Sequence, residues 1–162
     1  MQTQYTQAGN ARRAPHAPGG PVLILTGTGL ATAGVLTVIA VVHVYWAFGG
    51  RRGASGAIPE RNGGPLLTPT RGATLTVAAL LLAAALVVVA RVYYRGDLVP
   101  SWALATAVAA VGLAFTLRAV GDFRWVGFFK RHRTSAFARR DTWVYSPLSA
   151  ALATGCLLLA WG

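Results

Sequence analysis

The sequence predicts an all-α integral membrane protein, a four-helix bundle with short loops. Hydrophobic residues make up 54% of its 162 residues and charged residues only 12%, which is about half the charged share of a soluble domain. A helix needs about 20 apolar residues to cross the hydrocarbon core of a bilayer, and four stretches of this chain reach or approach that length. The whole chain fits one domain of ordinary size.

The first predicted span covers residues 22–48 and contains no Asp, Glu, Lys or Arg. Residues 1–20 are rich in Gln, Thr, Ala, Pro and Gly without periodicity, and they are predicted to form a disordered tail. A cleaved secretory signal is the alternative, because Arg12 and Arg13 precede the apolar run and residues 31–33 are small. The run continues to Phe48, which favours a membrane anchor.

The other spans are predicted over residues 72–92, 98–120 and 142–162, which completes a transmembrane domain of residues 21–162. The fourth span has two candidate starts. Ser146 and Pro147 suit an N-cap and a first helical position, whereas a start near Asp141 gives a helix of about 20 residues. The longer helix is favoured because it crosses the bilayer, with Pro147 tolerated in its second turn.

Basic residues in the short loops predict the orientation. The first loop contains Arg51, Arg52, Arg61 and Arg71, and the third loop contains six further basic residues. The tail and the second loop, on the opposite side, contain fewer basic residues. The first and third loops are therefore expected in the cytoplasm and both termini outside, in the inner (plasma) membrane.

Two spans carry small residues along one helix face, where helices in lipid pack closely. These residues are Gly27, Ala31 and Gly34 in the first span, and Ala105, Ala109 and Gly112 in the third. Such faces suit a tight bundle, a homo-oligomer or a partner membrane protein.

Polar residues of the spans converge on the face with the first and third loops, because antiparallel spans bring these helix ends together. This polar cluster consists of His43, Tyr45, Trp46, Arg118, Asp122, Asp141, Tyr145 and Ser146. Arg118 and Asp122 lie four residues apart, so an ion pair is expected on one helix face. The pair is either structural, with Arg118 reaching the interface, or functional, binding an anionic headgroup or relaying a proton. His43 is expected to make a structural hydrogen bond rather than carry a proton or bind a metal.

Aromatic and basic side chains alternate in the third loop, which is typical of a membrane interface. Residues 123–131 do not form a clean amphipathic helix, and Gly127 favours a loop or broken turn in the headgroup layer. The candidates for binding anionic lipid headgroups are Arg124, Lys130, Arg131, Arg133, Arg139 and Arg140. Nucleic-acid binding is not expected, since the patch offers only generic charge.

No spacing of His, Cys, Gly or Ser matches a metal, nucleotide or nucleophile motif such as HExxH, CxxC or GxSxG. Neither a metal nor a cofactor is therefore expected. With only four Asp and Glu in the chain, an acid–base pair would have to come from Asp122 and Asp141, helped by His43 or Tyr145.

Three strings of the sequence resemble a known family: HVYW (43–46), RAVGDFRWVGFFKR (118–131) and FARRDTWVYSP (137–147). Together they resemble domain of unknown function 3995, a family of small bacterial, often actinobacterial, membrane proteins. The resemblance covers most of the chain from about the first span onward. It implies a multi-span membrane protein and supplies no catalytic residues, because the activity of the family is unassigned.

Two functions are compatible with these features. The first is a non-catalytic bundle that binds lipid or partner helices, which the small size and the missing motifs favour. The alternative is a membrane-embedded enzyme or carrier that uses the polar cluster on a lipid-like or isoprenoid-like molecule at the cytoplasmic face. An ion channel is disfavoured, because no polar stripe crosses the second span or the middle of the third. Whether the protein is an enzyme stays open at this point.

Overall fold

The computed structural model describes residues 19–61 and 64–162, and most of this part of the chain is helical. Its helices are α1 (Gly20–Ala47), η1 (Ala54–Gly56), α2 (Arg71–Tyr93), α3 (Ser101–Val120), α4 (Ala136–Arg140), η2 (Asp141–Tyr145) and α5 (Ser146–Trp161). A short antiparallel hairpin pairs β1 (Glu60–Arg61) with β2 (Gly64–Pro65). Among the described residues, four helices are long and apolar enough to cross a membrane. The predicted all-α, four-span class is confirmed, while residues 1–18 of the predicted tail lie outside the described residues.

The fourth spanning helix begins at Ala136, earlier than either start considered from the sequence. Ser135 caps it, since its hydroxyl accepts the N–H of Ala138 at 3.1 Å. The helix continues through η2, a π-helical turn in which the N–H of Ser146 bonds to the carbonyl of Asp141. Pro147 has no N–H to donate, and in a regular helix its ring would clash with the carbonyl four residues earlier. The wider π-helical turn directly before Pro147 relieves this clash. One helix therefore runs from Ala136 to Trp161.

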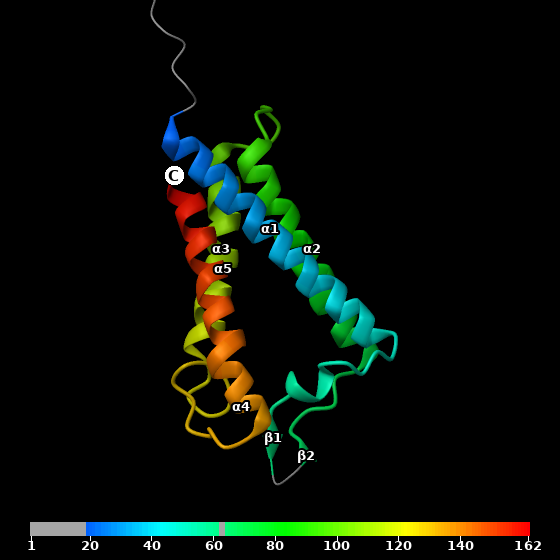
Figure 1. The fold of residues 1–162 in the computed structure, drawn as a ribbon. Helices are drawn as coiled ribbons and strands as arrows, with labels where there is room; N and C mark the ends of the chain where they lie inside the picture. Colours follow the sequence, from blue (N-terminus) through cyan, green and yellow to red (C-terminus); the bar gives the residue numbers. More distant parts are fainter. Residues whose placement is uncertain (1–18, 62–63) are drawn as a thin grey trace, which may run out of the picture.

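The spanning helices form two hairpins (Figure 1). In the first hairpin α1 packs along α2, and in the second hairpin α3 packs along the helix made of α4, η2 and α5. The hairpins meet at the end that holds the C-terminus and the start of α1, and they diverge toward the other end. Loop one (residues 48–70) and loop three (residues 121–135) lie at this divergent end.

Small side chains let the hairpins approach each other at the terminal end. A Cβ added to Gly155 of α5 would lie 2.5 Å from Oγ1 of Thr32 on α1. Gly112 contacts α5 as the small-residue face predicts, but Gly27 and Gly34 face open space. The buried glycine of α1 is instead Gly29, which lies tightly against Val92 of α2 and also contacts Leu159 of α5. The core around these contacts consists of Ala33, Leu36, Ala85, Val88, Val108, Leu152, Cys156 and Leu159.

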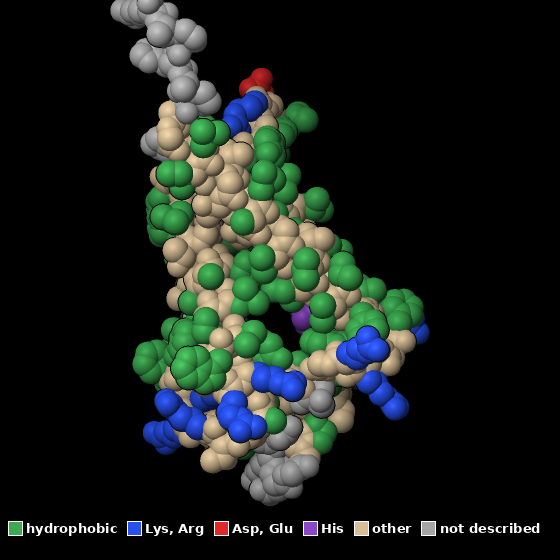
Figure 2. Space-filling view, in the orientation of Figure 1, with side chains coloured by type: hydrophobic (Ala, Val, Ile, Leu, Met, Phe, Trp, Pro, Cys, Tyr) green, Lys and Arg blue, Asp and Glu red, His purple; other side chains and the backbone are tan. Residues whose placement is uncertain are grey.

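Larger side chains face one another toward the divergent end. His43 and Trp46 on α1 and Phe115 and Tyr145 on the second hairpin all line a space of about 440 Å³, which we call the interhairpin cavity. Figure 2 shows this hollow between the hairpins, with Lys and Arg side chains gathered below it at the loop end. The splayed arrangement thus places a cavity next to the basic end of the molecule.

Candidate functional site

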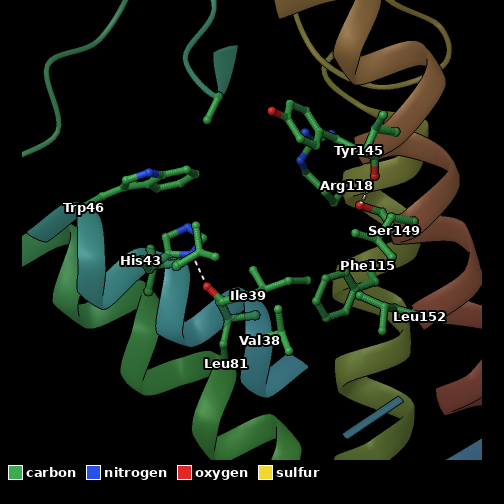
Figure 3. Close-up of a pocket in the computed structure, with 15 residues that line it drawn as sticks. Val38, Ile39, His43, Trp46, Leu81, Phe115, Arg118, Tyr145, Ser149 and Leu152 are labelled. Atoms are coloured by element: carbon green, nitrogen blue, oxygen red, sulfur yellow. Dashed lines mark hydrogen bonds between the residues drawn. The ribbon is translucent and has the colours of Figure 1, made fainter. Parts of the chain in front are cut away.

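The interhairpin cavity has a polar mouth and an apolar inner end. Figure 3 shows His43 and Trp46 on the first hairpin and Arg118 and Tyr145 on the second, around the same space. Farther along the helices from the loops, the walls become aliphatic and aromatic. The labelled residues of this inner part are Val38, Ile39, Leu81, Phe115 and Leu152. Four members of the predicted polar cluster are therefore brought to one cavity.

His43 is held by the backbone of its own helix. Its Nδ1 lies 2.8 Å from the carbonyl oxygen of Ile39, and its ring meets Trp46 edge-on with 5.2 Å between ring centroids. A carbonyl oxygen only accepts hydrogen bonds, so Nδ1 donates and carries a proton here. In the neutral ring, Nε2 then keeps its lone pair. The structural hydrogen bond expected of His43 is present.

Loop one is fastened to both sides of the cavity. Trp46 donates from Nε1 to the carbonyl of Arg52 at 2.9 Å, and the hydroxyl of Tyr145 donates to the carbonyl of Gly56 at 3.0 Å. Ala57 of this loop is part of the cavity wall. The predicted residue Tyr45 lies elsewhere: it is 46% exposed and does not line the cavity.

Asp141 is the centre of a buried charge network with Arg118 and Lys130. Its Oδ1 accepts from Nη2 of Arg118 at 2.7 Å, and its Oδ2 accepts from Nζ of Lys130 at 2.9 Å. Oδ2 also accepts the N–H of Gly127 at 2.8 Å and the hydroxyl of Ser146 at 3.2 Å. Asp141 and Lys130 are 0% and 1% exposed. Charges this deeply buried persist only when paired and hydrogen-bonded, as these are.

The charge network corrects one expectation from the sequence. Arg118 pairs with Asp141, which is 23 residues away, and not with Asp122. The reason is that α3 ends at Val120 and the chain turns at Gly121 with φ +88°. Asp122 is therefore no longer on the helix face that carries Arg118.

Asp122 instead organises loop three. Its Oδ1 accepts the N–H groups of Arg124, Trp125 and Val126 at 2.9, 2.7 and 2.9 Å. Burial acts to raise the pKa of Asp122, but these backbone hydrogen bonds outweigh it, so the pKa lies below its ordinary value of 3.8. The carboxylate thus stabilises a turn rather than an ion pair.

Loop three is folded onto the end of α3. Gly121 and Gly127 both have φ +88°, and a Cβ added to Gly127 would clash with the Cα of Gly121. The ring of Trp125 stacks on His132 with 3.9 Å between centroids. The broken turn predicted at Gly127 is present, but it is the centre of an ordered cap.

The basic residues of this region separate into two groups. Lys130 points inward, where Nζ also donates to the carbonyl of Gly127 and to Oγ1 of Thr142 at 2.9 and 2.7 Å. The sequence predicted Lys130 as a ligand of headgroups, but its side chain is buried and does not face them. The other five candidates are exposed: Arg124, Arg131, Arg133, Arg139 and Arg140. Their contact with anionic headgroups stays a prediction.

One guanidinium nitrogen of Arg118 is buried without a hydrogen-bond partner in the described parts of the chain. Nη2 is used by Asp141, whereas Nη1 is buried and has no hydrogen-bond partner among residues 19–61 and 64–162. The side chain as a whole is 35% exposed and lines the interhairpin cavity. A partly exposed cation is therefore part of the cavity wall, although its Nη1 is itself covered by protein. In the described part of the chain, no group of three or more His, Cys, Asp or Glu side chains is placed to hold a metal ion.

Sequence reasoning missed the inward role of Lys130 and the contributions of Thr142 and Ser149 to this region. One signal was available for Lys130, because it is the only lysine beside fourteen arginines. A flexible ammonium with three donors fits a compact buried site better than a planar guanidinium. Thr142 and Ser149 carry no such mark, since Ser and Thr are common in spanning helices.

Comparison with known proteins gives one match. The family described as "Protein of unknown function (DUF3995)" matches residues 36–156. No curated protein and no solved structure matches the chain. The matched stretch runs from the middle of α1 into α5 and includes the charge network and the whole cavity wall. Because the match covers most of its length, the chain belongs to the DUF3995 family of proteins of unknown function.

Proposed function

We propose that this multi-pass membrane protein is a non-catalytic, lipid-binding bundle of the inner membrane and that its ligand occupies the interhairpin cavity. The observation that carries the proposal is the cavity itself. Its volume of about 440 Å³ falls in the range of about 300–1,000 Å³ that small-molecule sites occupy. Its apolar inner end and polar mouth match the two ends of an amphiphile.

The position of the cavity also supports this function. It lies between four helices that are long and apolar enough to span a bilayer, so a lipid-like molecule can reach it from the membrane. The exposed arginines of loop three and α4 lie at the same end of the molecule. Basic residues near the membrane surface attract anionic lipids, by about 1 kcal/mol each.

Native mass spectrometry in mild detergent tests the proposal with a matched pair of variants. Val42 lines the cavity, whereas its neighbour Val41 is 60% exposed and does not. We expect the wild type and Val41→Trp to carry one bound lipid-like molecule, and Val42→Trp, whose indole fills the cavity, to lose it. A wild type that stays empty after incubation with membrane lipids, or a Val42→Trp variant that binds equally well, would overturn the proposal.

A second candidate function is a membrane-embedded enzyme or carrier for a lipid-like or isoprenoid-like molecule. The observation that favours it is the hydrogen bond from Nδ1 of His43 to the carbonyl of Ile39. It leaves the Nε2 lone pair on a residue of the cavity wall, as a general base requires. A change in the mass of the recovered ligand after incubation, abolished by His43→Gln, would favour this candidate over simple binding.

A further inference from the structure

We propose that the ligand of the interhairpin cavity is an amphiphile with a single negative charge, and that its head group binds the guanidinium group of Arg118. This inference rests on the proposed function and adds the chemical class of the ligand. It follows from a count of charges, from the partly exposed cation in the cavity wall and from the order of residues along the cavity.

The charge network contains one more positive charge than negative charge. Arg118 and Lys130 are both cations, and Asp141 is their single carboxylate partner. Asp141 cannot compensate further, because it already accepts from four donors: the two cations, the N–H of Gly127 and the hydroxyl of Ser146. One negative charge is therefore missing from a neutral site.

The exposure of the two cations shows where that charge belongs. Lys130 makes three hydrogen bonds within the protein, so the incomplete member of the network is Arg118. One of its nitrogens donates to Asp141, and its side chain is 35% exposed and lines the cavity. A guanidinium already fixed by Asp141 is oriented to bind a carboxylate or phosphate oxygen.

The cavity walls fix the orientation of the molecule. Arg118 lies near the loop end of α3, whereas Phe115 on the same helix and Ile39 and Leu81 on the first hairpin line the part farther from the loops. A head group at Arg118 places its apolar chain along these residues. Loop one contributes Ala57 to the wall beyond the head group, held there by Tyr145.

The experiment compares probes that differ in head-group charge and share their apolar chain. Delipidated protein in neutral detergent is titrated with oleate or oleyl alcohol, and separately with dioleoyl phosphatidylglycerol or dioleoyl phosphatidylcholine, with binding followed by native mass spectrometry. The wild type is expected to prefer the anionic member of at least one pair by about tenfold or more, as one charge-assisted hydrogen bond provides. Preference for oleate identifies a free single-chain acid, and preference for phosphatidylglycerol identifies a bilayer phospholipid.

Arg118→Gln is expected to abolish the preference, whereas Arg95→Gln, which removes an exposed charge in the loop between α2 and α3, outside the cavity, is expected to keep it. Equal binding of charged and neutral probes by the wild type would overturn the inference, and this comparison needs no variant to fold. An Arg118→Gln variant that keeps the preference would also overturn it. Failure of the proposed function looks different: no probe binds the wild type, or Val42→Trp binds all probes as the wild type does.

Discussion

Replacing Asp141 by asparagine tests whether the charge network stabilises the fold. The change keeps the size of a side chain that is fully buried but removes its charge. Arg118, which is partly exposed, and Lys130, which is buried, both donate to this carboxylate and then become two cations without an anion. Asparagine also turns an N–H₂ group toward one of the donors, so that donor loses its acceptor.

The expected loss of stability follows from these contacts. Two hydrogen bonds to charged groups are lost or weakened, at about 1.5–3 kcal/mol each, in agreement with about 3–5 kcal/mol for breaking a buried ion pair. This is a large part of the total stability of about 5–15 kcal/mol of a typical domain. Lys130→Met should cost less, because it leaves the pair of Arg118 and Asp141 balanced.

Thermal unfolding followed by circular dichroism in one mild detergent measures the difference. At about 2–4 °C per kcal/mol for a chain of this size, the Tm of Asp141→Asn should fall by about 6–20 °C. Asp97→Asn is the matched control, because Asp97 is an exposed carboxylate outside the network, and its Tm should not change. A Tm of Asp141→Asn within about 2 °C of the wild type, or a larger fall for Lys130→Met, would refute this reasoning.

Two further predictions concern loop three. Gly127→Ala should lower the Tm, because φ +88° alone costs a residue with a Cβ about 1–3 kcal/mol and the new methyl group meets the facing backbone; Gly72→Ala, with open space around it, is the control, and equal Tm values would contradict the prediction. The pKa of Asp122 is below 3.8 in the fold and about 3.9 in an unfolded chain. Its charge therefore stabilises the fold fully above the unfolded pKa, and this stabilisation is lost as the pH falls through the folded pKa. The Tm difference between wild type and Asp122→Asn should therefore shrink when the pH is lowered from 6 to 3, and a constant difference would show that the charge of Asp122 does not stabilise the loop.

The amino-acid sequence by itself determined the class of the protein and the approximate position of its spans. The predicted spans at residues 22–48, 72–92 and 98–120 each match a helix of the structure to within three residues at either end. The physical reason is that hydrocarbon allows no unpaired backbone group, so every long apolar run must be helical. The collection of polar residues at one end also follows from the sequence, because alternating spans bring the same helix ends together.

Only the tertiary structure decided the partners of these polar residues. Arg118 is four residues from Asp122 yet pairs with Asp141, since the turn at Gly121 takes Asp122 off the helix. Lys130 is one of many basic residues in its loop, but the fold of that loop turns it inward to Asp141. Helical spacing constrains neighbours within one helix, whereas contacts between helices depend on how the helices rotate and pack.

The cavity likewise depended on packing that no local pattern contains. Small residues bring the hairpins together at Gly155 and Thr32, and larger ones such as His43 and Phe115 lie across the space where they diverge. Composition supplied both kinds of residue, but the rotation of the helices placed Gly29 rather than Gly27 of α1 against α2 and α5. The sequence thus determined that the chain crosses a membrane, and the packing of its two hairpins decided where a ligand has room.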